Sequence, residues 1–379
     1  MIPQCDPHAN YIAHRGAIDA AIARVLSGQR YVLGPEVAGF EAEFAAAMGA
    51  SWAVGVANGT DAVELALRAV GVTAQDSVAT VSHGAIATVS AIARLGARPL
   101  FVDVDPRRCT MSPESLKAML HSPAGGSVRA VVIVHLYGQP ADMTGLMDQV
   151  RERGIPVVED CAQAHGAKLH GRPVGTWGAL GCFSFYPTKN LGAIGDGGAV
   201  IGRDPALETT LRLLREYGWR ERHVSETFGA NSRLDELQPA ILRAKLPHLR
   251  AENQRRRIIA GHYNDLLADC TLTLPLLVPA SDPVYHQYVV SVHERDRLQA
   301  SLLEAGVTTL VHYPRPIHKQ PAYADPECCP IPLPDTESLA RRVISLPMFP
   351  ELSDSDVAAV ARRVRRCLAM HDQRDPSSD

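Results

Sequence analysis

The feature that most limits how this chain can fold is the alternation of short apolar runs with helical patterns between about residues 13 and 260. Short apolar runs predict buried strands, and the segments between them carry apolar residues at helical spacing. Strands that alternate with helices favour right-handed crossovers and a mostly parallel sheet covered on both faces, which is an α/β architecture. The predicted strands are residues 51–56, 77–81, 98–102, 130–134 and 155–158, and the predicted helices are residues 60–70, 85–95, 113–121 (after Ser112 as N-cap) and 142–153.

The alternation changes after Asp160. Residues 182–186 and 198–201 predict two strands with no helix between them, joined by a glycine-rich loop or hairpin. A hairpin here would add an antiparallel pair to the mostly parallel sheet, whereas a loop would not.

A second, smaller unit is expected towards the C-terminus. Residues 234–267 predict one long helix, or two helices that meet at Pro247. Short segments that follow, and a helix over residues 354–368, predict an α+β arrangement. We therefore expect a large domain over residues 1–250, including the N-terminal segment, and a small C-terminal domain over residues 251–379.

The composition argues against several classes of function. The formal net charge is −3 and both signs are mixed along the chain, so we expect neither nucleic acid nor a membrane as a partner. The polar N-terminus shows no signal-peptide pattern, and no apolar run approaches the roughly 20 residues that span a bilayer. We expect a cytoplasmic protein with eight reduced cysteines. Because their spacing matches no metal motif, we expect no metal site.

Two carboxylates, Glu159 and Asp160, end the apolar run that begins at Ile155. Ligands in open α/β sheets bind beyond the carboxyl ends of the strands. A carboxylate here either faces a cationic ring nitrogen of a ligand or caps the next helix, and the segment alone favours neither.

Lys189 follows a predicted strand in a segment rich in small residues, with glycines that let the backbone approach a ligand closely. A lysine shielded from water loses its proton more easily and can form a Schiff base. Ser184 offers a hydroxyl group for a phosphate. The alternative is a surface lysine in a flexible loop. A dinucleotide site is disfavoured because a strand, not a helix, follows the glycines at 195–198.

A third candidate segment is Ala57-Asn-Gly-Thr-Asp61, directly before a predicted helix. Gly59 and Thr60 place free N–H groups and a hydroxyl at the helix N-terminus, which suits a phosphate. An ordinary helix cap is the alternative.

Together these segments resemble the DegT/DnrJ/EryC1/StrS family of sugar aminotransferases over nearly the whole chain. The matching segments are Tyr31-Val-Leu-Gly-Pro-Glu36, Asn58-Gly-Thr-Asp61, His135-Leu-Tyr-Gly-Gln139, Glu159-Asp-Cys-Ala-Gln-Ala-His-Gly166, Phe183-Ser-Phe-Tyr-Pro-Thr-Lys-Asn-Leu-Gly192, Gly195-Asp-Gly-Gly198, Asn231-Ser-Arg-Leu-Asp-Glu-Leu-Gln238 and Val311-His-Tyr-Pro314.

The resemblance implies a fold type I pyridoxal 5'-phosphate (PLP) enzyme, similar to aspartate aminotransferase, and a homodimer whose active sites lie at the subunit interface. Lys189 would form the Schiff base, and Asp160 would pair with the pyridinium nitrogen. Gln163 would contact the ring or its hydroxyl, and the phosphate would be held by Gly59, Thr60, Ser184 and the neighbouring subunit's Asn231. His312 and Tyr313 would line the substrate pocket. Arg233 would bind the carboxylate of the amino donor, and the alternative for Arg233 is an interface salt bridge.

One segment departs from the family pattern. Many relatives have a threonine and an aromatic residue where this chain has Gly84-Ala85, in the segment that covers the PLP ring. Either His83 covers the ring, or it has a structural role and the pocket is more open there.

The function that the resemblance implies is transfer of an amino group from L-glutamate to a keto sugar on a nucleoside diphosphate, expected to be a 3-keto-6-deoxyhexose on dTDP. Amination at C-4 is an alternative. A regulatory protein that binds PLP or a sugar nucleotide without turnover is a second alternative. A PLP-dependent sugar dehydratase is disfavoured because such relatives have histidine in place of the lysine at position 189.

Overall fold

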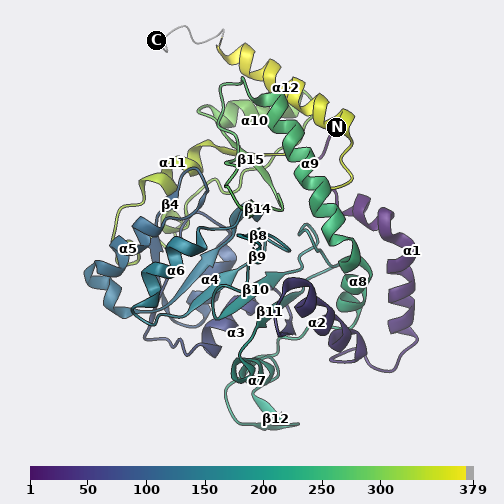
Figure 1. The fold of residues 1–379 in the computed structure, drawn as a ribbon, viewed down its shortest axis with the longest axis vertical. Coiled ribbons are helices and arrows are strands. Elements are labelled where there is room, and N and C mark those ends of the chain that lie inside the picture. The colour runs from purple at the N-terminus through teal and green to yellow at the C-terminus, as the bar shows by residue number, and fades with distance from the viewer. Residues whose placement is uncertain (373–379) are drawn as a thin grey trace.

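A seven-stranded sheet forms the centre of the structure, a computed structural model that describes residues 1–372 (Figure 1). Its strand order is β1-β11-β10-β7-β6-β2-β3, and β11 runs antiparallel to both neighbours while the other strands share one direction. This confirms the predicted α/β fold with a mostly parallel mixed sheet. The strand bounds are Trp52–Val56 (β1), Ser77–Val81 (β2), Arg98–Val102 (β3), Val128–Val134 (β6), Val157–Asp160 (β7), Leu180–Ser184 (β10) and Gly198–Gly202 (β11).

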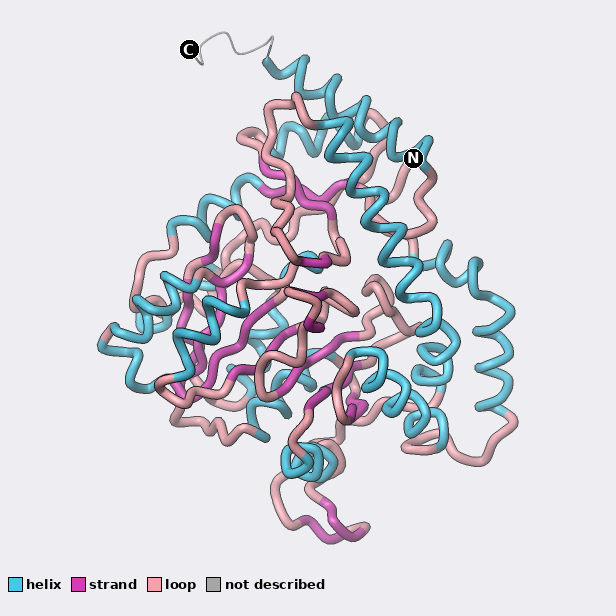
Figure 2. The backbone as a smooth tube through the Cα atoms, viewed as in Figure 1, coloured by secondary structure: helices cyan, strands magenta, loops and turns pink. Residues whose placement is uncertain are grey.

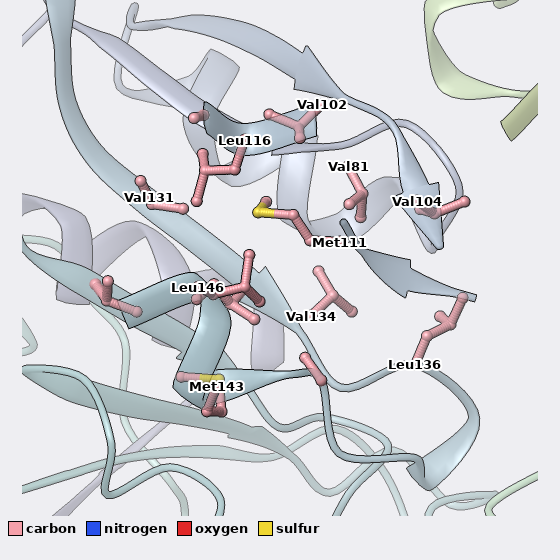
Figure 3. Close-up of a cluster of buried hydrophobic side chains, with 14 of the residues drawn as sticks. Val81, Val102, Val104, Met111, Leu116, Val131, Val134, Leu136, Met143 and Leu146 are labelled. Carbon is pink, nitrogen blue, oxygen red and sulfur yellow. The ribbon is translucent and has the colours of Figure 1, made fainter. Parts of the chain in front are cut away.

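Helices cover both faces of this sheet (Figure 2). Side chains alternate along β6: Val131 and Ile133 pack with one set of helices, and Val132 packs with the other. Figure 3 shows the first of these clusters, in which Leu116 and Leu146 meet the sheet residue Val131. One face is covered by α3 (Gly59–Ala69), α4 (Ile86–Arg94) and α7 (Pro205–Leu214), and the other by α2 (Pro35–Met48), α5 (Pro113–His121) and α6 (Met143–Arg151).

Several boundaries agree with the sequence expectations in detail. Helix α5 begins after Ser112, whose hydroxyl accepts a hydrogen bond from the Ser115 N–H. The predicted strands 182–186 and 198–201 correspond to the antiparallel pair β10–β11, although β10 lies two residues earlier than predicted, at Leu180–Ser184. The long helical segment is two helices, α8 (Leu237–Lys245) and α9 (Leu249–Leu267), which meet at a short turn containing Pro247.

A second core lies above the sheet, where α9, α10 (Arg295–Glu304) and α12 (Asp354–Asp372) pack around the antiparallel pair β15 (Tyr288–Ser291) and β16 (Val343–Leu346) (Figure 1). The N-terminal residues reach this unit, since Ile2 pairs with Val307. Residue 250 lies within α9, and the division of the chain there stays a prediction.

The remaining elements lie at the periphery. Helix α1 (Pro7–Leu26) packs on α8, and the hairpin β12–β13 projects beyond α7 (Figure 1). Within residues 1–372, no helix combines the length and apolar character needed to cross a membrane. The other elements are β4 (Val104–Asp105), β5 (Thr110–Met111), β8 (Lys168–Leu169), β9 (Arg172–Pro173), β12 (Trp219–Glu221), β13 (Val224–Ser225), β14 (Ser281–Asp282) and α11 (Pro334–Arg342).

Candidate active site

Three strands bring the predicted site residues to one edge of the sheet. Ser184, the last residue of β10, pairs with Gly198, the first residue of β11, and Gly198 also pairs with Val56 at the end of β1. Asp160 ends β7 and pairs with Cys182 of β10. The carboxyl ends of the parallel strands therefore place Asp160, Ser184 and the start of α3 at the edge where such sheets bind ligands.

The start of α3 forms a close-packed cradle with the end of β10. Asn58 is the N-cap, and its side chain accepts a hydrogen bond from the Asp61 N–H at 2.8 Å. The N–H groups of Gly59 and Thr60 lie in the first turn, where a helix provides no acceptor for them. A Cβ atom at Gly59 would lie 2.6 Å from the Ser184 Cβ, so glycine permits this approach. The arrangement suits an anionic group such as a phosphate.

Lys189 follows β10 in a turn in which its N–H donates to the Tyr186 carbonyl at 2.8 Å. Burial lowers the pKa of Lys189 to about 8, and the nearby charge of Asp160 opposes this shift. Its amine is therefore far more easily deprotonated than that of an ordinary lysine, as a nucleophile or a general base requires. The alternative of a solvated surface lysine does not agree with this environment.

Asp160 is buried and held in place by two hydrogen bonds. The Thr88 hydroxyl donates to Oδ2 at 2.6 Å, and the Ala162 N–H donates to Oδ1 at 3.0 Å. Thr88 lies on α4, one turn after Gly84-Ala85, the pair that differs from the family pattern. The start of α4 therefore faces the Asp160 carboxylate. A Cβ atom at Gly84 would meet only Val81 at 4.0 Å, and the space beside this pair is open.

Glu159 points to the opposite face of the sheet from Asp160, as alternation along a strand requires. Its carboxylate accepts hydrogen bonds from three backbone N–H groups, at Gly175, Trp177 and Gly178, each at 2.7 Å. The His135 Nε2–H donates to the same carboxylate at 3.0 Å, because the His135 Nδ1 accepts from the Ala141 N–H.

His135, Glu159 and Cys161 bring potential metal-ligand atoms within 4.8 Å of one another. The hydrogen bonds of Glu159 already occupy its oxygens, and burial raises the pKa of the Cys161 thiol. These groups therefore suit a structural role, and the absence of a metal site stays a prediction.

Gln163 links the sheet edge to the small unit. Its Oε1 accepts from the Tyr137 N–H at 2.7 Å, and its Nε2 donates to the Tyr313 hydroxyl at 3.1 Å. The Tyr137 hydroxyl donates to the His312 carbonyl and pairs with the His83 Nε2 at 2.9 Å. His83 is fully buried in this network, and its role in cofactor binding stays a prediction.

His312 and His286 lie close to Lys189 from the side of the small unit. Burial and the charge of Lys189 lower the pKa values of both imidazoles, to about 4 for His312. The His312 Nδ1 pairs with the Ser345 hydroxyl at 2.8 Å, and the His286 Nδ1 pairs with the Asn190 Oδ1 at 3.2 Å. Both rings are therefore neutral near pH 7.

The segment that contains Asn231 and Arg233 is held beside the start of α3. The Ala57 N–H donates to the Ser232 hydroxyl at 3.1 Å, and this hydroxyl donates to Asp61 at 2.6 Å. Asn231 itself is exposed, and the buried Arg233 Nε has no hydrogen-bond partner in the described part of the chain.

Sequence reasoning missed Thr88, Tyr137 and His286 as neighbours of the site. Thr88 is an ordinary helical residue in the sequence, and only the fold brings it to Asp160. Tyr137 lies within one of the matching segments, which is a signal that could have identified it. His286 carries no recognisable local pattern, since it is separated from Lys189 by nearly 100 residues.

This sheet, with one antiparallel strand beside the strand that leads to the half-buried Lys189, is that of a fold type I aminotransferase. Residues 13–365 match the DegT/DnrJ/EryC1/StrS aminotransferase family, and the chain belongs to this family. The chain is 44% identical over 373 residues to dTDP-3-amino-3,4,6-trideoxy-alpha-D-glucose transaminase of Streptomyces venezuelae, covering 98% of this chain and 97% of that one.

Two further comparisons agree with this assignment. UDP-N-acetyl-3-dehydro-alpha-D-glucosamine 3-aminotransferase of Acidithiobacillus ferrooxidans is 42% identical, with 97% of this chain and 98% of that one covered. The crystal structure of S. venezuelae DesV in complex with a ketimine intermediate superposes with a TM-score of 0.92 at 45% identity, covering 96% of this chain and 98% of that one. The chain is therefore an aminotransferase.

Proposed function

We propose that this enzyme transfers an amino group from L-glutamate to a 3-keto-6-deoxyhexose carried on dTDP. The observation that carries the proposal is the half-buried Lys189, with its lowered pKa, beside the Asp160 carboxylate that Thr88 and Ala162 hold in place. The relatives named above act on nucleotide sugars aminated at C-3, which favours C-3 over C-4 as the position of amination.

The residues present fit PLP. The cradle of Gly59, Thr60 and Ser184 would hold the phosphate, Asp160 would face the pyridine nitrogen, and Lys189 would carry the cofactor between turnovers. When bound, PLP supplies an electron sink that stabilises negative charge at the reacting carbon. The Asp160 carboxylate, held in position by Thr88 and Ala162, would accept a hydrogen bond from a protonated ring nitrogen and so favour that form of the ring.

Lys189 acts as the acid and base in both halves of the reaction. Its neutral Nζ accepts the proton from the α-carbon of the amino donor, and its ammonium form returns a proton to the carbon that becomes aminated. A pKa of about 8 keeps both forms available near neutral pH. His312 and Tyr313 border the reacting groups, and Arg233, whose Nε has no partner in the described residues, binds the donor's carboxylate.

We further propose a homodimer in which the partner's Asn231 completes the phosphate site. Three exposed apolar side chains lie near the lysine loop: Tyr31, Ile194 and Leu237. Hydrogen bonds link their segments, because the Tyr31 carbonyl accepts from the Glu236 N–H and the backbone of Ile194 pairs with the Gln238 side chain, on either side of Leu237 in sequence. A second copy of this chain would cover the three side chains. A cytoplasmic location stays a prediction.

The test separates the two halves of the reaction. Wild-type enzyme with PLP and L-glutamate alone should convert to the pyridoxamine form, which absorbance reports, and this form should aminate dTDP-3-keto-6-deoxyhexose in a second step. Lys189→Ala should lose both steps by more than a thousandfold, because the variant lacks the amine that moves the proton in each half of the reaction.

Other outcomes identify the alternatives. Amination of only 4-keto sugars would move the reaction to C-4. Binding of PLP without any conversion by glutamate, or by other amino acids, would favour a regulatory protein. Activity retained by Lys189→Ala would overturn the proposed role of this residue.

A further inference from the structure

A cavity of about 320 Å³ lies against the lysine loop, between the N-terminal residues and the small unit. Its walls come from residues 3–5, from Pro7 and Thr188, and from five residues between 286 and 312. A smaller cavity that Lys189 lines shares Cys5, Pro7 and Thr188 with it. Burial, together with the charge of Lys189, lowers the pKa values of two histidines in its wall, His286 and His312. The larger cavity therefore adjoins the reactive amine.

Several polar groups that line this cavity have no partner within residues 1–372. Gln4 is 6% exposed and its side-chain amide makes no hydrogen bond there, while Gln287 is 7% exposed and its buried Oε1 receives no donor. The Nε2 atoms of His286 and His312 are likewise unpaired, since both rings use only Nδ1. Of these groups, only the Gln287 Oε1 is fully shielded from water, and such an atom costs about 1–3 kcal/mol if it stays unpaired. The Gln4 amide and the two Nε2 atoms are free to form hydrogen bonds with a ligand in the cavity.

The chemistry of this ligand follows from the absence of charge. No Arg, Lys, Asp or Glu side chain lines the cavity, and the two imidazoles are neutral near pH 7. A carboxylate or a diphosphate would therefore find no charged side chain in the wall of this cavity to pair with. Amides, neutral imidazoles and threonine hydroxyls both donate and accept, as the hydroxyl groups of a sugar require.

We propose that this cavity is the subsite for the hexose ring of the amino acceptor, and that Gln4 and Gln287 determine specificity by binding its hydroxyl groups. This inference rests on the proposed function, in which the acceptor is a sugar nucleotide. It assigns the N-terminal segment to the active site, and it places the donor's carboxylates and the acceptor's diphosphate outside this cavity.

The test compares the binding of dTDP and dTDP-glucose to the PLP-bound enzyme by calorimetry. dTDP-glucose has no ketone and cannot be aminated, so the ratio of the two Kd values isolates the contribution of the hexose. Wild-type enzyme should bind dTDP-glucose more tightly than dTDP. Gln4→Leu and Gln287→Leu should each reduce this advantage by about five- to tenfold, as loss of a hydrogen bond predicts, and should leave the Kd of dTDP unchanged.

Gln75→Leu, the same change on an exposed turn, is the matched control and should leave both Kd values unchanged. Neither Gln4 nor Gln287 uses its side chain to hold the fold within the described residues, and thermal melting checks that both variants remain folded. The glutamate half-reaction should proceed at the wild-type rate in both variants.

Three results would overturn the proposal. The first is a wild-type enzyme that binds dTDP-glucose no more tightly than dTDP. The second is variants in which the Kd values of dTDP and dTDP-glucose rise by the same factor. The third is variants in which the rate of the glutamate half-reaction falls by a larger factor than the affinity for the hexose. If the hexose advantage is present and lost as expected but no keto sugar is aminated, the subsite is supported and only the proposed reaction is wrong.

Discussion

At the scale of single residues, the ionisation of Lys189 has the largest effect on the site. Its pKa of about 8, against an ordinary 10.5, leaves roughly a tenth of the amine neutral at pH 7. In the cofactor-free enzyme, we expect the rate of Lys189 modification by trinitrobenzenesulfonate to rise with a midpoint near pH 8. Asp160→Asn should lower this midpoint, because the charge of Asp160 raises the pKa.

The same shift has a defined effect on stability. Because the folded-state pKa lies below the unfolded value, the folded chain binds fewer protons between about pH 8 and 10.5. Burial of the charged Lys189 therefore lowers the free energy of unfolding by its full amount below pH 8, and this cost disappears as the pH rises from about 8 to 10.5.

In the modification experiment, Lys189→Ala removes the fast-reacting amine and is the control. A midpoint near the ordinary value of 10.5 would contradict the assigned environment.

A second prediction at this scale concerns Glu159, whose carboxylate accepts three backbone N–H groups and His135 in a fully buried position. Glu159→Gln replaces one acceptor oxygen with an NH₂ donor that faces these donors. We expect a loss of about 3 kcal/mol in the free energy of unfolding, measured in urea, because buried donors lose their partner. Glu152→Gln, on an exposed helix end, should change stability by less than about 0.5 kcal/mol.

The stabilising role of this cluster also has a chelation test. EDTA should leave the urea midpoint of the wild type unchanged, since three N–H groups already occupy the Glu159 oxygens. A lower midpoint in EDTA that zinc restores would show that His135, Glu159 and Cys161 hold a metal after all.

At the scale of elements, apolar periodicity was sufficient to predict the parallel strands and the helices between them. β2 and β3 begin and end at the predicted residues, because these runs are buried on both faces and bounded by polar turns. The pairing of β10 with β11 was left open, since the connection between them encodes no regular pattern and is ordered by contacts with the rest of the fold.

The close approach of α3 to β10 gives a prediction at the same scale. Gly59→Ala would bring a Cβ atom within 2.6 Å of the Ser184 Cβ, so the helix must move away from the strand. We expect PLP to bind at least tenfold more weakly, as fluorescence titration would measure, because the N–H groups of the first turn are displaced from the phosphate.

Gly261→Ala on α9 is the matched control, since nothing lies within 4 Å of its added Cβ. It should leave PLP binding unchanged and stabilise the helix by up to about 1 kcal/mol. Equal PLP affinity in Gly59→Ala and the wild type would place the phosphate elsewhere.

At the scale of the whole molecule, the second core and its contacts with the N-terminus exceed what sequence patterns could predict. Ile2 pairs with Val307, and Gln287 lies across from Gln4 in one cavity, although some 280 residues separate them in sequence. Periodicity describes neighbours along the chain, whereas such contacts depend on how two packed units close on each other. The candidate substrate residues were therefore predictable only by resemblance, and Gln4 was not predictable at all.

The quaternary arrangement provides the last prediction. Ser232 is bonded to its own chain's Ala57 and Asp61, so Asn231 can serve either its own phosphate site or the partner's. If sites are shared, a dimer of one Lys189→Ala subunit and one Asn231→Ala subunit contains one site with both defects and one intact site. Mixing and refolding the two inactive variants in equal amounts should then restore about a quarter of the wild-type activity. If each Asn231 serves its own subunit, both sites of the mixed dimer stay defective, and the mixture keeps only about half of the residual activity of Asn231→Ala alone at the same total concentration.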